Sequence, residues 1–159
     1  MKKVYFNRTE WRNDKGEIHK DEGPAVEWNN GYKEWYQNGE RHRLDGPAIE
    51  WSNGTREWFF NDKLHRLDGP AVEHSDGSTQ WFQNGKLHRL DGPAREYSDG
   101  TKHWCQNGKH HRLDGPAAEY KDGSKEWYLD GRAFGTEQEW FEALTEDKKI
   151  AYLFKLGEK

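Results

Sequence analysis

The sequence predicts a mainly β protein made of tandem 23-residue antiparallel β-hairpin repeats, an elongated twisted sheet, with a C-terminal pair of α-helices as a cap. Two observations predict the repeat. All five prolines are spaced 23 residues apart, at Pro24, Pro47, Pro70, Pro93 and Pro116. A variant of the run His65-Arg66-Leu67-Asp68-Gly69-Pro70-Ala71 surrounds each of them. Constant spacing over five copies indicates units that stabilise one another along the chain.

Each repeat contains a hairpin signal. Asp76-Gly77 separates two short strand-like runs, and the other copies carry Asn-Gly or Asp-Gly at the same place. Such a pair favours a two-residue type I′ turn, whose central residues both need positive φ. That turn pairs Ser75 with Ser78 and Val72 with Trp81, which places Val72 and Trp81 on one face of the sheet. Because a single hairpin is marginal in water, successive units are expected to pair edge to edge.

The connector between hairpins carries two further turn signals, Asn84-Gly85 and Asp91-Gly92-Pro93. We expect the first to be a second tight turn and the second to lead into the next strand. Residues 1–134 are therefore predicted to form an array of about five to six hairpin units.

Residues 135–159 depart from the repeat and are predicted to form a helical cap. Thr136-Glu137-Gln138-Glu139 is typical of a capping box. Trp140, Phe141 and Leu144 follow as an apolar stripe, and a second helix is expected from Thr145 to Gly157. We interpret the pair as a lid over the last strand edge. The alternative is a partner-docking element that leaves the apolar residues of the second helix exposed, namely Tyr152, Phe154 and Leu156.

Composition excludes several classes of function. The net charge of −4 and the pI near 6.1 do not favour a binder of duplex nucleic acid or of an anionic membrane surface. The first residues lack the apolar run of a signal peptide, and no stretch is apolar enough to span a membrane. The single cysteine, Cys105, excludes an intramolecular disulfide framework. We therefore expect a cytoplasmic protein, in the host cytoplasm if a phage encodes it.

The period of 23, the Asp-Gly turn and the run Trp-x-x-x-Gly-Lys-x-His at Trp81–His88 resemble a MORN-type repeat over about residues 5–134. The chain is similar in particular to variant MORN repeats of bacterial antitoxin-like proteins and of uncharacterised phage proteins. It lacks the usual Tyr-x-Gly-x-Trp, and His-Arg-Leu-Asp-Gly-Pro replaces a simpler His-Gly-x-Gly. The resemblance implies a hairpin array used as a binding surface for proteins or lipids.

Four His-Arg pairs and two tryptophans are candidate binding residues. They are His42, Arg43, His65, Arg66, His88, Arg89, His111, Arg112, Trp28 and Trp51. One hypothesis is an internal ladder in which each arginine pairs with a strand glutamate such as Glu50 or Glu73 and each aspartate caps its Gly-Pro turn. The other is a series of cations that faces an acidic partner or a phosphorylated small molecule.

The histidines are not expected to bind a metal. Equivalent copies should lie about 9–10 Å apart, which is too far for imidazoles to share a zinc ion. We expect them to bond turn backbone or to lie against tryptophan, and we expect no cofactor. The tryptophans are expected to pack across the strands against Val26, Ile49 or Val72, giving the first three units an apolar face. That face is a hypothetical site for a partner or for homo-oligomer formation.

No nucleophilic triad, Walker loop or zinc-protease motif is present in the sequence, and Cys105 stands where other copies have Tyr or Phe. Five similar units also offer no single unlike constellation for an active site. The sequence therefore predicts a non-enzymatic scaffold that binds a protein partner, antitoxin-like or of the phage counter-defence type. The alternative is sequestration of a nucleotide or other anionic small molecule in Arg/His/Trp grooves between repeats.

Overall fold

The computed structural model describes residues 1–157, which form 21 short strands and two C-terminal helices. All strand pairs within a unit are antiparallel, so the predicted class of β-hairpin repeats with a terminal helix pair is confirmed. The chain divides into two compact units, unit 1 (Met1–Gly85) and unit 2 (from Lys86 onward). Among the described residues, no helix is long and apolar enough to cross a membrane.

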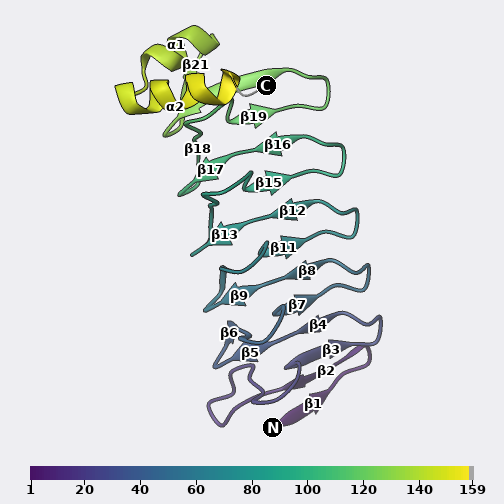
Figure 1. Cartoon of the computed structure of the whole chain (residues 1–159). Coiled ribbons are helices and arrows are strands. Elements are labelled where there is room, and N and C mark those ends of the chain that lie inside the picture. Colours follow the sequence, from purple (N-terminus) through teal and green to yellow (C-terminus); the bar gives the residue numbers. More distant parts are fainter. Residues whose placement is uncertain (158–159) are drawn as a thin grey trace. The chain divides into compact units, whose positions relative to one another are not determined.

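Unit 1 alternates strands of one main sheet with small two-stranded hairpins (Figure 1). Its main sheet has the order β1-β2-β3-β4-β7-β8-β11-β12. These strands are β1 (Lys2–Val4), β2 (Arg8–Trp11), β3 (Val26–Trp28), β4 (Lys33–Glu34), β7 (Ile49–Glu50), β8 (Arg56–Glu57), β11 (Val72–Glu73) and β12 (Thr79–Gln80). The remaining strands are β5 (Tyr36–Gln37), β6 (Glu40–Arg41), β9 (Phe59–Phe60), β10 (Lys63–Leu64) and β13 (Phe82–Gln83).

Unit 2 continues the same alternation and ends in the helices. Its main-sheet strands, in the order in which they pair, are β15 (Arg95–Glu96), β16 (Lys102–His103), β19 (Ala118–Glu119), β20 (Lys125–Leu129) and β21 (Arg132–Phe134). Its other elements are β14 (Lys86–Leu87), β17 (Cys105–Gln106), β18 (Lys109–His110), α1 (Glu137–Glu142) and α2 (Glu146–Gly157).

The turn predicted at Asp76-Gly77 is longer than expected. His74 N–H donates to the Ser78 carbonyl at 2.9 Å, and Gly77 N–H donates back to the His74 carbonyl at 3.0 Å, so the loop has three residues. Only Gly77 (φ +88°) has positive φ in this loop. Asp76 Oδ1 accepts the Ser78 N–H at 2.8 Å, a local bond that holds Asp76 on the right-handed side. The predicted type I′ turn here is therefore wrong.

Type I′ turns occur instead in the small hairpins. Asn61 and Asp62 have φ of +48° and +58° and join β9 to β10, where Phe60 pairs with Lys63. The second tight turn predicted at Asn84-Gly85 has the same signature, with φ of +50° and +77°. A turn whose two central residues both have positive φ is compatible with the right-handed twist of the strands that it joins.

The longer loop shifts the predicted register by one residue and changes which residues share a face. Val72 pairs with Gln80 rather than with Trp81. Trp58 N–H donates to the Ala71 carbonyl at 2.8 Å, which places the indole beside alanine on the face opposite Val72. The predicted Val–Trp cross-strand pair is therefore wrong, because one residue of slip moves a side chain to the other face.

Alanine, not valine, is the constant core position of the repeat. The residue after each proline is fully buried, at 0 % exposure: Ala25, Ala48, Ala71, Ala94 and Ala117. In unit 1 a small apolar cluster of Ala48, Ile49 and Phe59 lies at one such position. Because protein interiors are close-packed, a fully buried methyl group leaves little room there for a larger side chain.

The predicted single apolar tryptophan face of the first units is also wrong. Trp28 and Trp51 follow Val26 and Ile49 by two residues and share their face. Tryptophans of the repeat position, such as Trp58, lie on the opposite face with the alanines. The two sets of indoles therefore do not form one surface.

The two predicted C-terminal helices are present and pack on their unit. Thr136 Oγ1 accepts the Glu139 N–H at 3.1 Å, which confirms the N-terminal cap. Trp140, Leu144 and Tyr152 are buried together with Trp127 in one apolar cluster. Tyr152 is thus not exposed, contrary to the docking alternative, whereas Phe154 and Leu156 are exposed.

Replacement of Ala71 by leucine tests the alanine core. We expect Ala71→Leu to lower the free energy of unfolding by about 1–3 kcal/mol, because a fully buried methyl position has no room for a larger side chain. Leu67→Ala, at an exposed position of the same repeat, should change it by no more than about 0.5 kcal/mol. Urea denaturation followed by tryptophan fluorescence measures both. Equal effects of the two substitutions would contradict the assignment.

Candidate functional site

The four proline-containing segments that carry a His-Arg pair form loops that lead from a small hairpin to the next main-sheet strand. We call them the proline loops: residues 42–47 and 65–70 in unit 1, and residues 88–93 and 111–116 in unit 2. They contain eight of the candidate binding residues, the four His-Arg pairs. Their conformation comes from the arginine in each loop.

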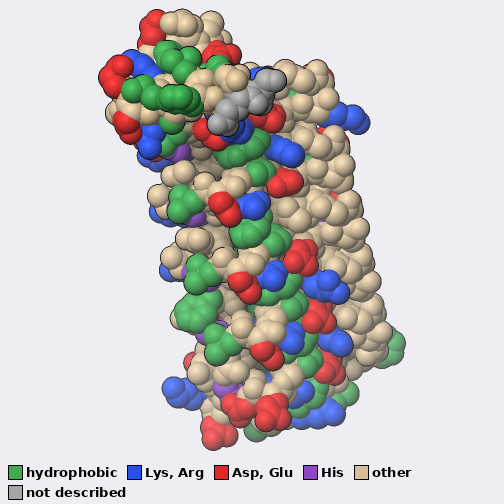
Figure 2. Space-filling view, in the orientation of Figure 1, with side chains coloured by type: hydrophobic (Ala, Val, Ile, Leu, Met, Phe, Trp, Pro, Cys, Tyr) green, Lys and Arg blue, Asp and Glu red, His purple; other side chains and the backbone are tan. Residues whose placement is uncertain are grey.

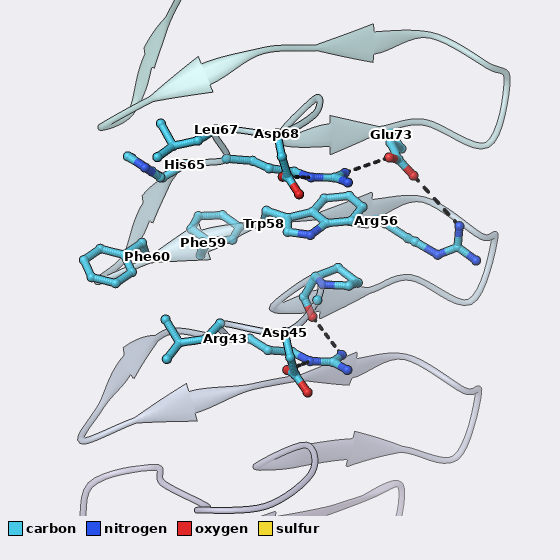
Figure 3. A pocket seen from close by; sticks show the side chains of 14 residues that line it. Arg43, Asp45, Arg56, Trp58, Phe59, Phe60, His65, Leu67, Asp68 and Glu73 are labelled. Atoms are coloured by element: carbon cyan, nitrogen blue, oxygen red, sulfur yellow. Dashed lines mark hydrogen bonds and ion pairs between the residues drawn. The ribbon is translucent and has the colours of Figure 1, made fainter.

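The arginine binds its own loop and the strand that follows. Arg66 Nε donates to Asp68 Oδ1 at 3.0 Å, while Nη1 donates to the Pro70 carbonyl at 3.1 Å and to Glu73 Oε1 at 2.9 Å (Figure 3). Arg43 and Arg112 make the same three contacts within their own repeats. The predicted arginine–glutamate ladder is therefore confirmed, but the aspartates bind arginine rather than capping the Gly-Pro turn.

Each guanidinium is also held between an indole and a glycine. Arg66 Cζ lies 4.1 Å from the centre of the Trp58 ring, and Arg112 Cζ lies 3.7 Å from the Trp104 ring. A Cβ at Gly69 would lie only 2.6 Å from Arg66 Cζ. Glycine precedes proline here because the guanidinium needs close approach, not because the backbone needs a positive φ.

These contacts also fix the charge of the loops. Hydrogen bonds and charge from Arg43 and Arg66 hold the pKa of Asp45 and Asp68 below the usual aspartate value. Nε and Nη1 of Arg43 and Arg66 are engaged within the protein, and both arginine side chains are about one-fifth exposed. An external anion would have to compete with two carboxylates for each guanidinium.

The repeated histidines hold the turn of the next small hairpin. His65 Nδ1 accepts the Asn84 N–H at 3.2 Å, and His111 Nδ1 accepts the Asp130 N–H at 3.1 Å. The expected bond to turn backbone is confirmed. Within residues 1–157 no three His, Cys, Asp or Glu side chains lie close enough to hold a metal ion.

The other two candidates, Trp28 and Trp51, lie away from the proline loops. Tyr32 stands between them, with ring centres 6.5 Å from Trp28 and 4.7 Å from Trp51. Arg8 Cζ lies 4.9 Å from the Trp28 ring, and Trp51 Nε1 donates to Glu57 at 2.7 Å. They form an aromatic stack on the valine face that is partly covered by its own polar neighbours.

The leucines of the proline loops were not predicted as site residues, yet three of them are strongly exposed. Leu44, Leu67 and Leu90 are 82 %, 73 % and 75 % exposed. The sequence does contain a signal: each leucine stands between Arg and Asp in a polar loop outside any strand, where no core position explains an apolar residue. On the face drawn in Figure 2, apolar side chains alternate with acidic and basic ones over the repeats.

A groove separates the two proline loops of unit 1. It has a volume of about 880 Å³, and its lining includes Trp58, Phe60, Leu67 and both Arg-Asp pairs. Trp58 lies between the two loops, beneath the Arg66 side chain (Figure 3). A second groove of about 970 Å³ adjoins the loop at residues 42–45. Both are open to solvent, which suits a contact with another protein surface better than an enclosed small molecule.

Unit 2 contains one unusual polar cluster. His103 Nδ1 and His110 Nε2 lie 3.0 Å apart, and desolvation lowers the pKa of both rings. Cys105 on β17 is buried, and burial raises the pKa of its thiol, so it lacks the thiolate character of a nucleophile. The cluster therefore fits packing at the one repeat whose aromatic position holds a cysteine.

Comparison with protein-family models and with curated proteins gives no match to this chain.

A double-mutant cycle tests the stack of indole, guanidinium and glycine. We expect Gly69→Ala to lower the free energy of unfolding by about 1–3 kcal/mol, because its Cβ displaces the Arg66 side chain. In an Arg66→Ala background the same change should cost at least about 1 kcal/mol less. Thermal and urea unfolding of the four proteins measure this coupling. Strictly additive effects would show that the glycine is retained for another reason.

The aspartates predict a pH dependence of stability. A folded-state pKa below the unfolded value of about 3.9 means that the unfolded chain binds the proton more readily. The contribution of Asp68 is therefore complete above that value and is lost as pH falls through the folded pKa. We expect Asp68→Asn to be less stable than wild type at pH 7 and the difference to shrink toward pH 2. Asp14→Asn, at an exposed position outside the proline loops, is the control, and a difference that stays constant with pH would contradict the prediction.

Proposed function

We propose that this protein is a non-enzymatic repeat scaffold that binds a protein partner through its proline loops. The observation that carries the proposal is the exposure of Leu44, Leu67 and Leu90 on loops whose backbone is fixed from within. An exposed leucine adds little to the folding stability of the free protein. Its burial against a partner would contribute about 1.5–3 kcal/mol to the binding free energy. Rigid loops also lose little entropy on binding.

The chemistry around the leucines favours a protein over a small anion. The Asp45 and Asp68 carboxylates are exposed at the loop surface, whereas the guanidiniums lie beneath it in ion pairs. The most exposed groups of these loops are therefore leucines and aspartate carboxylates. This surface favours an apolar partner with basic neighbours, and it disfavours the alternative of a nucleotide held by arginine and histidine.

The resemblance to MORN-type repeats of antitoxin-like and phage proteins supports the same proposal and names its partner class. The partner would be a toxin, a defence protein or a host factor that is occluded when it binds. We place this interaction in the cytoplasm, in keeping with a chain that carries one cysteine and no disulfide framework.

Replacement of the unit 1 leucines by aspartate tests the proposal. Leu44→Asp/Leu67→Asp should weaken partner binding at least about 100-fold, because two buried leucines together contribute at least about 3 kcal/mol. Ser52→Asp/Ser75→Asp changes charge equally on exposed loops of the opposite strand ends and should bind normally. Proteins captured from the native cell by all three baits are compared by mass spectrometry, and the dissociation constant of the purified partner is then measured.

A partner retained equally by all three proteins, or no specific partner for the wild type, would refute binding through the proline loops. Circular dichroism of the variants must match wild type, which the exposure of the four positions leads us to expect.

A further inference from the structure

The fourth proline loop differs from the others because the chain's own helices cover it. Leu113 occupies the position of Leu44 and Leu67, yet it is partly buried against the cluster of Trp127, Trp140, Leu144 and Tyr152. The same loop conformation is therefore seen both bare and occupied within one chain. The occupied copy shows what kind of surface it accepts.

The helices make polar as well as apolar contacts with this loop. Trp140 Nε1 donates to the Arg112 carbonyl at 3.2 Å. Lys155 Nζ forms an ion pair with Asp114. Although desolvation opposes it, the hydrogen bonds from Lys155 and Arg112 lower the pKa of Asp114. The helices therefore contact the loop in three ways. The Trp140 indole bonds the loop backbone, apolar residues pack on Leu113, and Lys155 pairs with Asp114.

At this end of unit 2 the helices stand where a further proline loop would follow. Trp127 is the last tryptophan of the repeat, and Gly135 stands where an arginine would follow. Trp140 packs on Trp127 instead, with ring centres 4.7 Å apart. An aromatic side chain from a helix thus occupies the place that a guanidinium takes on other repeats.

The bare loops of unit 1 offer the same groups in the same conformation. Arg43 and Arg66 hold Asp45 and Asp68 at 2.9 and 3.0 Å, as Arg112 holds Asp114 at 2.8 Å. Each bare loop therefore presents an exposed leucine beside an exposed carboxylate. What the cap supplies to the fourth loop, and the first two lack, is an aromatic and apolar helix face with a lysine.

Resting on the proposed function, we propose that the partner docks an amphipathic helix on the proline loops of unit 1. The helix presents an aromatic residue and apolar neighbours to Leu44 or Leu67, and a lysine or arginine to Asp45 or Asp68. This reuses the apolar contact with Leu113 and the lysine contact with Asp114. The place of Trp140 is taken in unit 1 by a guanidinium, as Arg66 shows on Trp58. It is helix-in-groove recognition with an acidic rim that selects for basic helices.

A synthetic peptide with the sequence of residues 136–157 is the probe. It is titrated to about 1 mM into the full ¹⁵N-labelled chain, because an isolated helix of this length is only marginally stable and binds weakly. We expect amide shifts at residues 43–46 and 66–69 and at the Trp58 indole. Leu67→Asp in the protein should weaken binding at the second loop at least about tenfold.

Matched peptides test the basic contact. The peptide with Lys155→Glu should bind about tenfold more weakly, while the peptide with Lys148→Glu carries the same charge change and should bind within about twofold of the parent. Shifts absent from unit 1, shifts confined to residues 111–116, or equal losses for the two peptides would overturn the proposal. So would concentration-dependent oligomers abolished by Leu67→Asp, since the occupant would then be a second copy of this chain.

The two proposals fail differently. If a partner requires Leu44 and Leu67 but the peptide does not bind, only the proposal of a docked helix is refuted. If no partner requires these leucines, the proposed function itself is refuted, whatever the peptide does.

Discussion

The guanidinium in each proline loop makes three kinds of contact on which the repeat depends. It stacks on a tryptophan, it neutralises a loop aspartate and a strand glutamate, and it closes the loop through the proline carbonyl. A repeat with so few aliphatic residues cannot rely on a large apolar core. The flat cation supplies contact area and ion pairs at the same point, and the low local dielectric beside the indole strengthens both. The residue before the proline is glycine because the guanidinium lies against it.

Two kinds of turn keep the repeat in register. The three-residue loop with one left-handed glycine ends the main-sheet hairpin, and the type I′ turn ends the small hairpin. The histidine of each proline loop then bonds the type I′ turn of the following hairpin, as His65 does with Asn84. This bond adds a polar, local contact to the main-sheet pairing of neighbouring repeats, so that stability is shared along the array.

The periodicity of the sequence was sufficient to predict the hairpin repeat, the helix pair and the arginine–glutamate ladder. It was insufficient to predict register, because Asp-Gly fits both a two-residue and a three-residue loop. The Asp76 side chain decides between them by accepting the Ser78 N–H, and a propensity argument does not contain that bond. The one-residue error in register assigned the repeat tryptophans, such as Trp58, to the wrong face of the sheet. For the same reason the buried alanine position was not recognised. The exposed leucines were missed because constancy within a repeat suggests packing, whereas Leu44 and Leu67 are constant and bare.

The arrangement of charge separates what holds the loop from what the loop presents. The arginine of the loop is ion-paired within the protein. The most exposed side chains of the loop are therefore the leucine and the aspartate that is paired with this arginine. Where the chain covers this surface itself, at Leu113 and Asp114, it does so with an indole and a lysine. A partner must solve the same problem of burying an apolar side chain next to an anion. A helix with a basic flank solves it by contributing both groups from one rigid face, which limits the entropy lost on binding.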